Sequence, residues 1–161
     1  MKKIAQQLKG LISTPKKIVI TTHRGPDGDA IGSSLGLFHL LKQLGHTVNV
    51  ITPNEYANFL HWLPGNKEVI IYEGNETAAD KITAESDLIF LLDFSDLSRI
   101  APFNNTVSKS KATKIMIDHH ENPKSFCDFD FSFPNAVFIN IKNVININIE
   151  KIKPDQGFFI E

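Results

Sequence analysis

A chain of 161 residues with 42% hydrophobic and 22% charged residues has the size and composition of one globular domain with its own core. Its net charge of −1 gives no reason to expect strong non-specific binding to nucleic acid. The single cysteine, Cys127, excludes an intramolecular disulfide and fits a reducing compartment. No run approaches the roughly 18 apolar residues of a membrane span, and residues 1–5 do not lead into the apolar core of a signal peptide. We therefore predict a cytoplasmic protein with no membrane partner.

The spacing of apolar residues predicts helices and strands that alternate along the chain. Ile4, Leu8, Leu11 and Ile12 recur at helical spacing, which predicts a short N-terminal helix. This helix is expected to end near Gly10. Helices are also predicted at 29–44 and 76–85, and strands at 16–22, 46–51, 67–72, 87–93 and 114–117. Residues 87–93 form the most apolar run, which is typical of a central parallel strand. This alternation predicts an α/β fold with a mostly parallel sheet flanked by helices.

Two segments between these elements are predicted to form short turns or loops. Residues 58–65 are predicted to form a short helical turn that ends at Pro64 and Gly65, in which His61 and Trp62 serve as packing residues. Residues 95–100 are predicted to begin a loop or a short helix.

The segment that joins the strand at 16–22 to the helix at 29–44 carries His23, Asp27 and Asp29. One imidazole and two carboxylates are ligands that suit Mn²⁺ and, with fewer nitrogen atoms, Mg²⁺. The glycines and the proline between them permit a tight turn, so the three side chains can converge. A structural explanation competes with this one: Asp29 can cap the helix, Asp27 can form an Asx-turn, and His23 can be incidental.

Two further strand ends carry the same kinds of side chain. Asp93 ends the apolar run, and Asp118, His119 and His120 follow the strand at 114–117. In a parallel sheet these ends lie along one edge, so the groups can gather around two metal ions about 3.5–4 Å apart, with Asp93 as the bridge. Asp118 is expected to orient an imidazole. Taken singly, Asp93 could cap a helix that starts near residue 95, and the two histidines could lie in a solvated loop.

Three motifs together resemble the DHH phosphoesterase superfamily, and within it the bacterial branch of nanoRNases and pAp-phosphatases. The likeness extends over residues 1 to about 136 and includes 122–123 and 133–136. The motifs are His23-Arg24-Gly25-Pro26-Asp27-Gly28-Asp29-Ala30, Asp93-Phe94-Ser95-Asp96 and Asp118-His119-His120.

The resemblance implies a role for each residue of these motifs. His23, Asp27 and Asp93 would hold one Mn²⁺, and Asp29, Asp93 and His119 would hold the second. Mg²⁺ or Co²⁺ could take the place of Mn²⁺. His120 would lie near the scissile phosphate, with Asp118 in support, as the two catalytic residues. Arg99 would either contact substrate or pair with Asp96, and we favour the pairing.

The resemblance also implies a reaction. Water activated by the two cations would attack phosphorus, so that short RNA is cut from an end to nucleoside monophosphates and 3′-phosphoadenosine 5′-phosphate is converted to AMP. Full-length relatives would be homodimers. A non-catalytic protein that binds metal or nucleotide is the alternative from another class. A cyclic-dinucleotide phosphodiesterase or a pyrophosphatase is the alternative within the superfamily.

The C-terminal residues depart from the family pattern. Residues 1–136 are interpreted as an incomplete DHH catalytic domain, and residues 137–161 as an atypical tail rich in Ile, Asn and Lys. The tail could be one amphipathic strand, a low-complexity stretch, or the product of a frameshift near residue 136 in an A/T-rich gene. A fourth motif with another metal-binding Asp and a C-terminal substrate-binding domain are not recognised, since Asp155 lacks the expected context. We therefore expect weak or absent activity.

Overall fold

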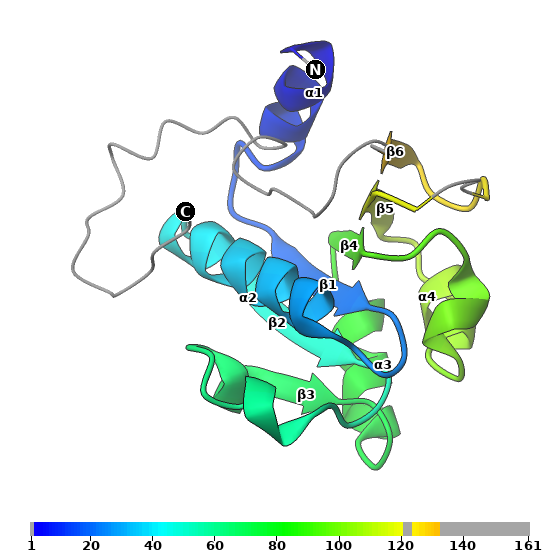
Figure 1. Ribbon diagram of the computed structural model, residues 1–161. Helices are drawn as coiled ribbons and strands as arrows, with labels where there is room; N and C mark the ends of the chain where they lie inside the picture. Colours follow the sequence, from blue (N-terminus) through cyan, green and yellow to red (C-terminus); the bar gives the residue numbers. More distant parts are fainter. Residues whose placement is uncertain (1, 121–123, 133–161) are drawn as a thin grey trace.

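The apolar run at 87–93 contains β4 (Leu88–Leu92), whose five residues are all buried in the middle of a parallel sheet. β4 lies between β1 (Lys17–Thr22) and β5 (Thr113–Asp118) (Figure 1). β2 (Thr47–Thr52) and β3 (Val69–Ile71) extend the sheet on the β1 side, and β6 (Phe129–Ser132) extends it beyond β5. The computed structural model describes residues 2–120 and 124–132. Its strand order is β3-β2-β1-β4-β5-β6, and each neighbouring pair is parallel.

The register of the strands brings three strand ends level. Thr22, the last residue of β1, pairs with Leu92, the last residue of β4, and Leu92 pairs with Ile117 of β5. The order in which strands are added to the sheet also reverses at β1: β2 and β3 lie on one side of β1, and β4, β5 and β6 lie on the other. Open parallel sheets bind ligands beyond the carboxyl ends of the strands at such a reversal. The residues after β1, β4 and β5 therefore share one crevice.

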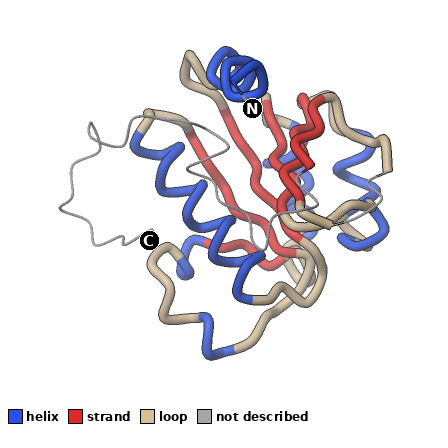
Figure 2. Tube along the Cα trace, turned by 45° about the horizontal axis from the view of Figure 1, so that its top comes forward, coloured by secondary structure: helices blue, strands red, loops and turns tan. Residues whose placement is uncertain are grey.

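Helices cover both faces of the sheet (Figure 2). One face packs against α1 (Lys2–Leu11) and α2 (Gly28–Gln43), in a core that contains Leu8, Leu37 and Phe90. The other face packs against α3 (Glu76–Ala84) and α4 (Asn104–Lys109), around Phe103 and Met116. Alternate residues of β1 and β4 face the two cores, as expected for strands buried on both sides.

The structure confirms the predicted parallel α/β fold and corrects some of its parts. β3 begins at Val69 and not at 67, because Asn66–Glu68 form a 3₁₀ turn (η2). Leu97–Ile100 form another 3₁₀ turn (η3), in agreement with a short helix at 95–100. The sequence analysis did not predict α4 or β6, which are short and lack clear apolar periodicity. The tail at 137–161, with Asp155, and residues 122–123 and 133–136 lie outside the described residues.

The turn at 58–65 is present, but Trp62 does not pack in the interior. Asn58–Leu60 form a 3₁₀ turn (η1) in which Leu60 is buried. Trp62 is 76% exposed, so its prediction as a packing residue is wrong. A 3₁₀ turn repeats every three residues, which places Leu60 and Leu63 inward and leaves Trp62 on the outer side. His61 is exposed as well, although its ring contacts the Tyr56 ring edge-on and lies 3.4 Å from the Glu55 carboxylate.

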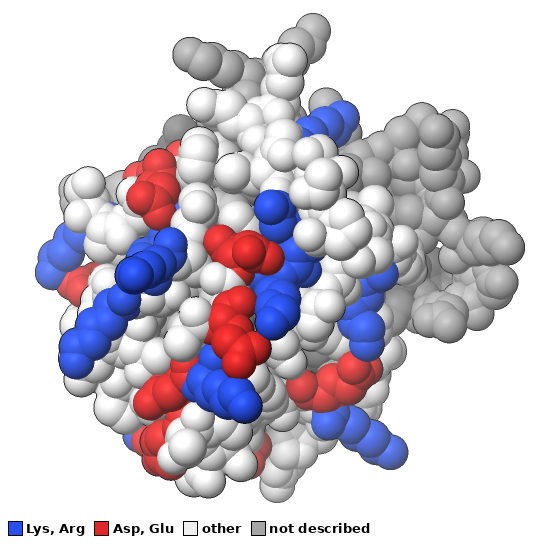
Figure 3. Space-filling view, turned by 180° about the vertical axis from the view of Figure 1, so that it is seen from behind, with Lys and Arg blue, Asp and Glu red and all other residues white. Residues whose placement is uncertain are grey.

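Charged side chains of both signs alternate on the face shown in Figure 3, in keeping with the net charge of −1. None of the helices within 2–120 and 124–132 combines the length and the apolar character needed to cross a bilayer.

Candidate metal centre at the carboxyl edge of the sheet

Residues 23–27, here called the ligand loop, leave β1 and enter α2. Asp27 is the N-cap of α2, and its Oδ1 atom accepts hydrogen bonds of 3.0 Å from the backbone N–H groups of Asp29 and Ala30. The helix begins here because this carboxylate satisfies two amide groups that lack partners within the helix. The sequence allowed Asp29 as the cap, whereas the structure gives this role to Asp27. In the described residues, no hydrogen bond engages the second carboxylate oxygen of Asp27.

His23 is 7% exposed and is oriented by its own loop. Its Nδ1 atom lies 2.9 Å from the backbone carbonyl of Arg24. A carbonyl oxygen can only accept, so Nδ1 carries a proton and Nε2 is the ring nitrogen directed at the site. Nε2 lies 3.7 Å from Oδ2 of Asp93, and this carboxylate raises the pKa of His23 against the opposing effect of burial.

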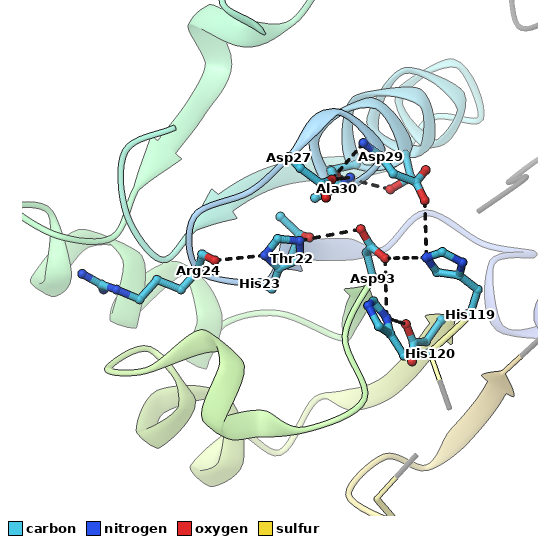
Figure 4. Close-up of polar contacts among 12 residues, drawn as sticks. Thr22, His23, Arg24, Asp27, Asp29, Ala30, Asp93, His119 and His120 are labelled. Atoms are coloured by element: carbon cyan, nitrogen blue, oxygen red, sulfur yellow. Dashed lines mark hydrogen bonds and ion pairs between the residues drawn. The ribbon is translucent and has the colours of Figure 1, made fainter. Parts of the chain in front are cut away.

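Asp93 lies at the centre of the site (Figure 4). It directly follows β4, is 3% exposed, and has φ of +65°, a left-handed backbone conformation that few residues other than glycine adopt. One carboxylate oxygen faces His23, and the other lies 3.1 Å from Nε2 of His119 and 3.7 Å from Nδ1 of His120. The left-handed turn thus places a buried carboxylate between imidazoles from two different strands. The structure assigns the cap of η3 to Asp96, so Asp93 is not a helix cap.

The end of β5 supplies a carboxylate and two imidazoles. Asp118 is 1% exposed, and its Oδ1 atom accepts a 2.7 Å hydrogen bond from Nδ1 of His120. This bond engages Nδ1 and leaves Nε2 as the other ring nitrogen of His120, on a side chain that is about half exposed. The two rings lie 4.9 Å apart at 64°, and both approach Asp93. Oδ2 of Asp118 is buried without a hydrogen-bond partner in the described residues.

These side chains form two groups that could each hold a cation. His23, Asp27 and Asp93 have ligand atoms within 4.8 Å of one another, and so do Asp93, His119 and His120. Asp93 belongs to both groups, which is the arrangement that a bridging carboxylate requires. The donor set fits a divalent metal, because carboxylate oxygens and imidazole nitrogens are the ligands that Mn²⁺ and similar ions bind.

Asp29 and Arg99 occupy less central positions. The Asp29 carboxylate, in the first turn of α2, lies 3.7 Å from Nε2 of His119, on the outer side of the second group. The favoured pairing of Arg99 with Asp96 is absent: the Asp96 carboxylate contacts the N–H of Ser98 and the ammonium of Lys124. Lys124 also lowers the pKa of Asp96. The Arg99 side chain is exposed and makes no hydrogen bond or ion pair within the described part of the chain, while its carbonyl accepts from the N–H of Arg24.

Residues that sequence reasoning did not single out surround the ligand loop. Asn54 follows β2, and its side-chain oxygen accepts a 2.7 Å hydrogen bond from the N–H of Gly25. Glu73 follows β3 and forms a 2.5 Å ion pair with Arg24. No spacing rule links residues 54 and 73 to the loop; only the adjacency of strand ends in a parallel sheet could have suggested them.

Comparison with known proteins agrees with this geometry. The family described as "DHH family, N-terminal domain" matches residues 17–143. The chain belongs to the DHH family. It is 35% identical over 127 residues to the bifunctional oligoribonuclease and PAP phosphatase NrnA of Thermus thermophilus, an alignment that covers 77% of this chain. It is also similar to the crystal structure of an exopolyphosphatase-related protein from Bacteroides fragilis, with a TM-score of 0.84 and 42% identity over 86% of this chain.

The chain spans only part of each of these DHH relatives. The alignments cover 33% of the length of the Thermus protein and 41% of the Bacteroides chain. The residues matched by the DHH family, 17–143, include the ligand loop, Asp93 and the residues that follow β5.

Proposed function

We propose that this chain is a metal-dependent phosphoesterase that uses two Mn²⁺ ions, or Mg²⁺ or Co²⁺, to hydrolyse phosphate esters of short nucleotides. The proposed substrates are short oligoribonucleotides, released as nucleoside monophosphates, and 3′-phosphoadenosine 5′-phosphate, converted to AMP. The observation that carries the proposal is the position of Asp93, whose two carboxylate oxygens face imidazoles from two strand ends. The names of the Thermus and Bacteroides relatives, a nucleotide phosphatase and an exopolyphosphatase-related protein, support the reaction class.

The residues of the site divide between holding cations and handling protons. His23, Asp27 and Asp93 would hold one ion, and Asp29, Asp93 and His119 would hold the other. When bound, the ions supply Lewis-acid stabilisation of charge on the phosphoryl oxygens and activate water as the nucleophile. Asp118 fixes the His120 ring through Nδ1, which leaves Nε2 of this half-exposed side chain available for proton transfer at the phosphate ester.

The test is product release from metal-loaded protein. The purified chain is incubated with a diribonucleotide, 3′-phosphoadenosine 5′-phosphate or polyphosphate in the presence of Mn²⁺, and phosphate and monophosphate are measured. Since the sequence predicts weak activity, we expect slow release from at least one nucleotide substrate. This release should be lost in Asp93→Asn and reduced about 10- to 100-fold in Asp118→Ala, which leaves His120 without its orienting partner. Polyphosphate as the sole substrate would replace ester hydrolysis by phosphoanhydride hydrolysis and would leave only metal-dependent hydrolysis at phosphorus in place.

Metal content separates the proposal from its alternative, a protein that binds metal or nucleotide without turnover. The alternative is considered because the chain covers only 33% of the Thermus relative. About two Mn²⁺ per chain agrees with the two groups around Asp93 and favours the enzyme. One ion or none, together with an absence of product, would favour the non-catalytic protein.

A further inference from the structure

The ligand loop is tied to three other segments of the protein by contacts that involve none of the proposed metal ligands. The backbone N–H of Arg24 donates to the carbonyl of Arg99 at 2.7 Å, and its guanidinium reaches the carbonyl of Ala101 at 3.3 Å and the carboxylate of Glu73 at 2.5 Å. The N–H of Gly25 donates to the side-chain oxygen of Asn54 at 2.7 Å. The partners come from the segment after β2, the turn after β3, and η3 with the residue after it.

These contacts act on the part of the loop that orients His23. The carbonyl of Arg24 holds the His23 ring through Nδ1, so a displacement of Arg24 would also displace that imidazole. Gly25 has φ of +63°, a conformation that glycine permits but does not enforce. The hydrogen bond from Gly25 to Asn54 therefore selects one conformation among several. Asn54 is itself oriented, because its side-chain N–H donates to the carbonyl of Glu55 at 2.9 Å.

We propose that Arg24, Asn54 and Glu73 are positioning residues that hold the ligand loop in its metal-binding geometry before an ion arrives. The inference rests on the proposed function, since it concerns the first of the two cation positions, formed by His23, Asp27 and Asp93. Fixing the backbone of a loop residue in one conformation has a cost in conformational entropy. A loop that is already ordered does not have to meet this cost when metal binds, and the affinity for metal rises accordingly.

The ion pair of Arg24 with Glu73 orders the ligand loop more than it stabilises the folded protein. Both side chains are nearly half exposed, at 48% and 45%, and exposed ion pairs contribute little to the free energy of unfolding. Removing the Glu73 charge should therefore leave the protein folded while it loosens the loop. The pair of Lys17 with Glu85, at 3.1 Å and with 59% and 51% exposure, is a matched control at the opposite end of β1.

The experiment measures Mn²⁺ affinity by calorimetry, and hydrogen exchange of the Arg24 and Gly25 amides in metal-free protein. The variants are Arg24→Met, Asn54→Ala and Glu73→Gln, with Glu85→Gln as control. We expect Arg24→Met and Asn54→Ala to bind the first Mn²⁺ about tenfold more weakly, and Glu73→Gln to show a smaller loss in the same direction. The two amides should exchange faster in these variants, while Glu85→Gln matches the unmodified protein in both measurements.

Several outcomes would overturn the inference. Unchanged Mn²⁺ affinity in folded Arg24→Met and Asn54→Ala would do so, as would unchanged exchange of the two amides. Unchanged Mn²⁺ affinity with a raised KM for nucleotide would show that the guanidinium contacts substrate instead. If Arg24→Met does not fold, Asn54→Ala and Glu73→Gln decide the question. If the unmodified chain binds no divalent ion, the proposed function fails, and the exchange rates of metal-free protein alone decide whether these residues order the loop.

Discussion

Asp93 combines a chemical role with an unfavourable backbone conformation, and substitutions can separate the two. A side chain at φ of +65° costs of order 1–3 kcal/mol, except where Gly, or to a lesser degree Asn, occupies the position. We expect Asp93→Gly, Asp93→Asn and Asp93→Ala all to lose Mn²⁺ binding. In metal-free urea denaturation, Asp93→Gly should be more stable than Asp93→Ala by about 1 kcal/mol. An alanine variant as stable as the glycine variant would show that the backbone carries no strain here.

At the scale of single residues, the sequence predicted which side chains meet at the sheet edge better than it predicted the residues around them. His23, Asp93 and His119 could be recognised because each type of side chain binds metals and each follows an apolar run. The sharing of Asp93 between two groups could be predicted from strand ends meeting at one edge of the sheet. The division of roles between Asp27 and Asp29 could not, because either carboxylate can cap a helix and only the backbone path decides which one does so.

At the scale of elements, the start of α2 depends on a residue that also belongs to the site. Asp27→Ala should reduce the free energy of unfolding by about 1 kcal/mol through loss of the helix cap and should also weaken Mn²⁺ binding. Asp27→Ser retains a capping oxygen, so it should restore most of the stability without restoring metal affinity. Thermal unfolding in EDTA and calorimetry with Mn²⁺ measure the two effects separately. Equal stability of the Ala and Ser variants would contradict the capping role.

The junction between α2, β1 and β2 contains a buried histidine that should make stability depend on pH. His46 is 6% exposed, its Nδ1 atom accepts a hydrogen bond from the N–H of Lys16, and burial lowers its pKa. The unfolded chain therefore binds a proton more readily than the native protein. The stability that neutral His46 provides is complete above pH 6.5, the ordinary value for histidine, and is lost as the pH falls below it.

A His46→Gln variant tests this dependence, because Gln can accept the same hydrogen bond without titrating. The unmodified protein should lose stability relative to His46→Gln below pH 6.5, by up to about 1.4 kcal/mol per pH unit. His23, whose pKa is raised, acts in the opposite direction, and the difference between the two proteins cancels its effect. Urea denaturation between pH 5 and 7.5 measures the difference, with His61→Gln as an exposed control. Parallel pH profiles would contradict the prediction.

At the scale of the whole molecule, the fold could be predicted where apolar periodicity is strong. The buried strands β1, β4 and β5 were located to within one or two residues, because both faces of each strand pack in the interior. The strand order required the structure, since strands β2 and β3 would give the same sequence pattern on either side of β1. α4 and β6 are held by tertiary contacts, such as burial of Val107 and Phe131, more than by local pattern.

Because the proposed cations join three separate strand ends, metal binding should stabilise the whole molecule. The unfolded chain does not hold His23, Asp93 and His119 together, so an ion that binds only the native protein shifts the folding equilibrium by mass action. At a free Mn²⁺ concentration 100 times its Kd, unfolding should become about 2.7 kcal/mol less favourable, which corresponds to a rise in Tm of about 5–10 °C. The rise should depend on Mn²⁺ concentration, reverse with EDTA and vanish in Asp93→Asn. A rise of equal size in Asp93→Asn would place the stabilising ion elsewhere on the protein.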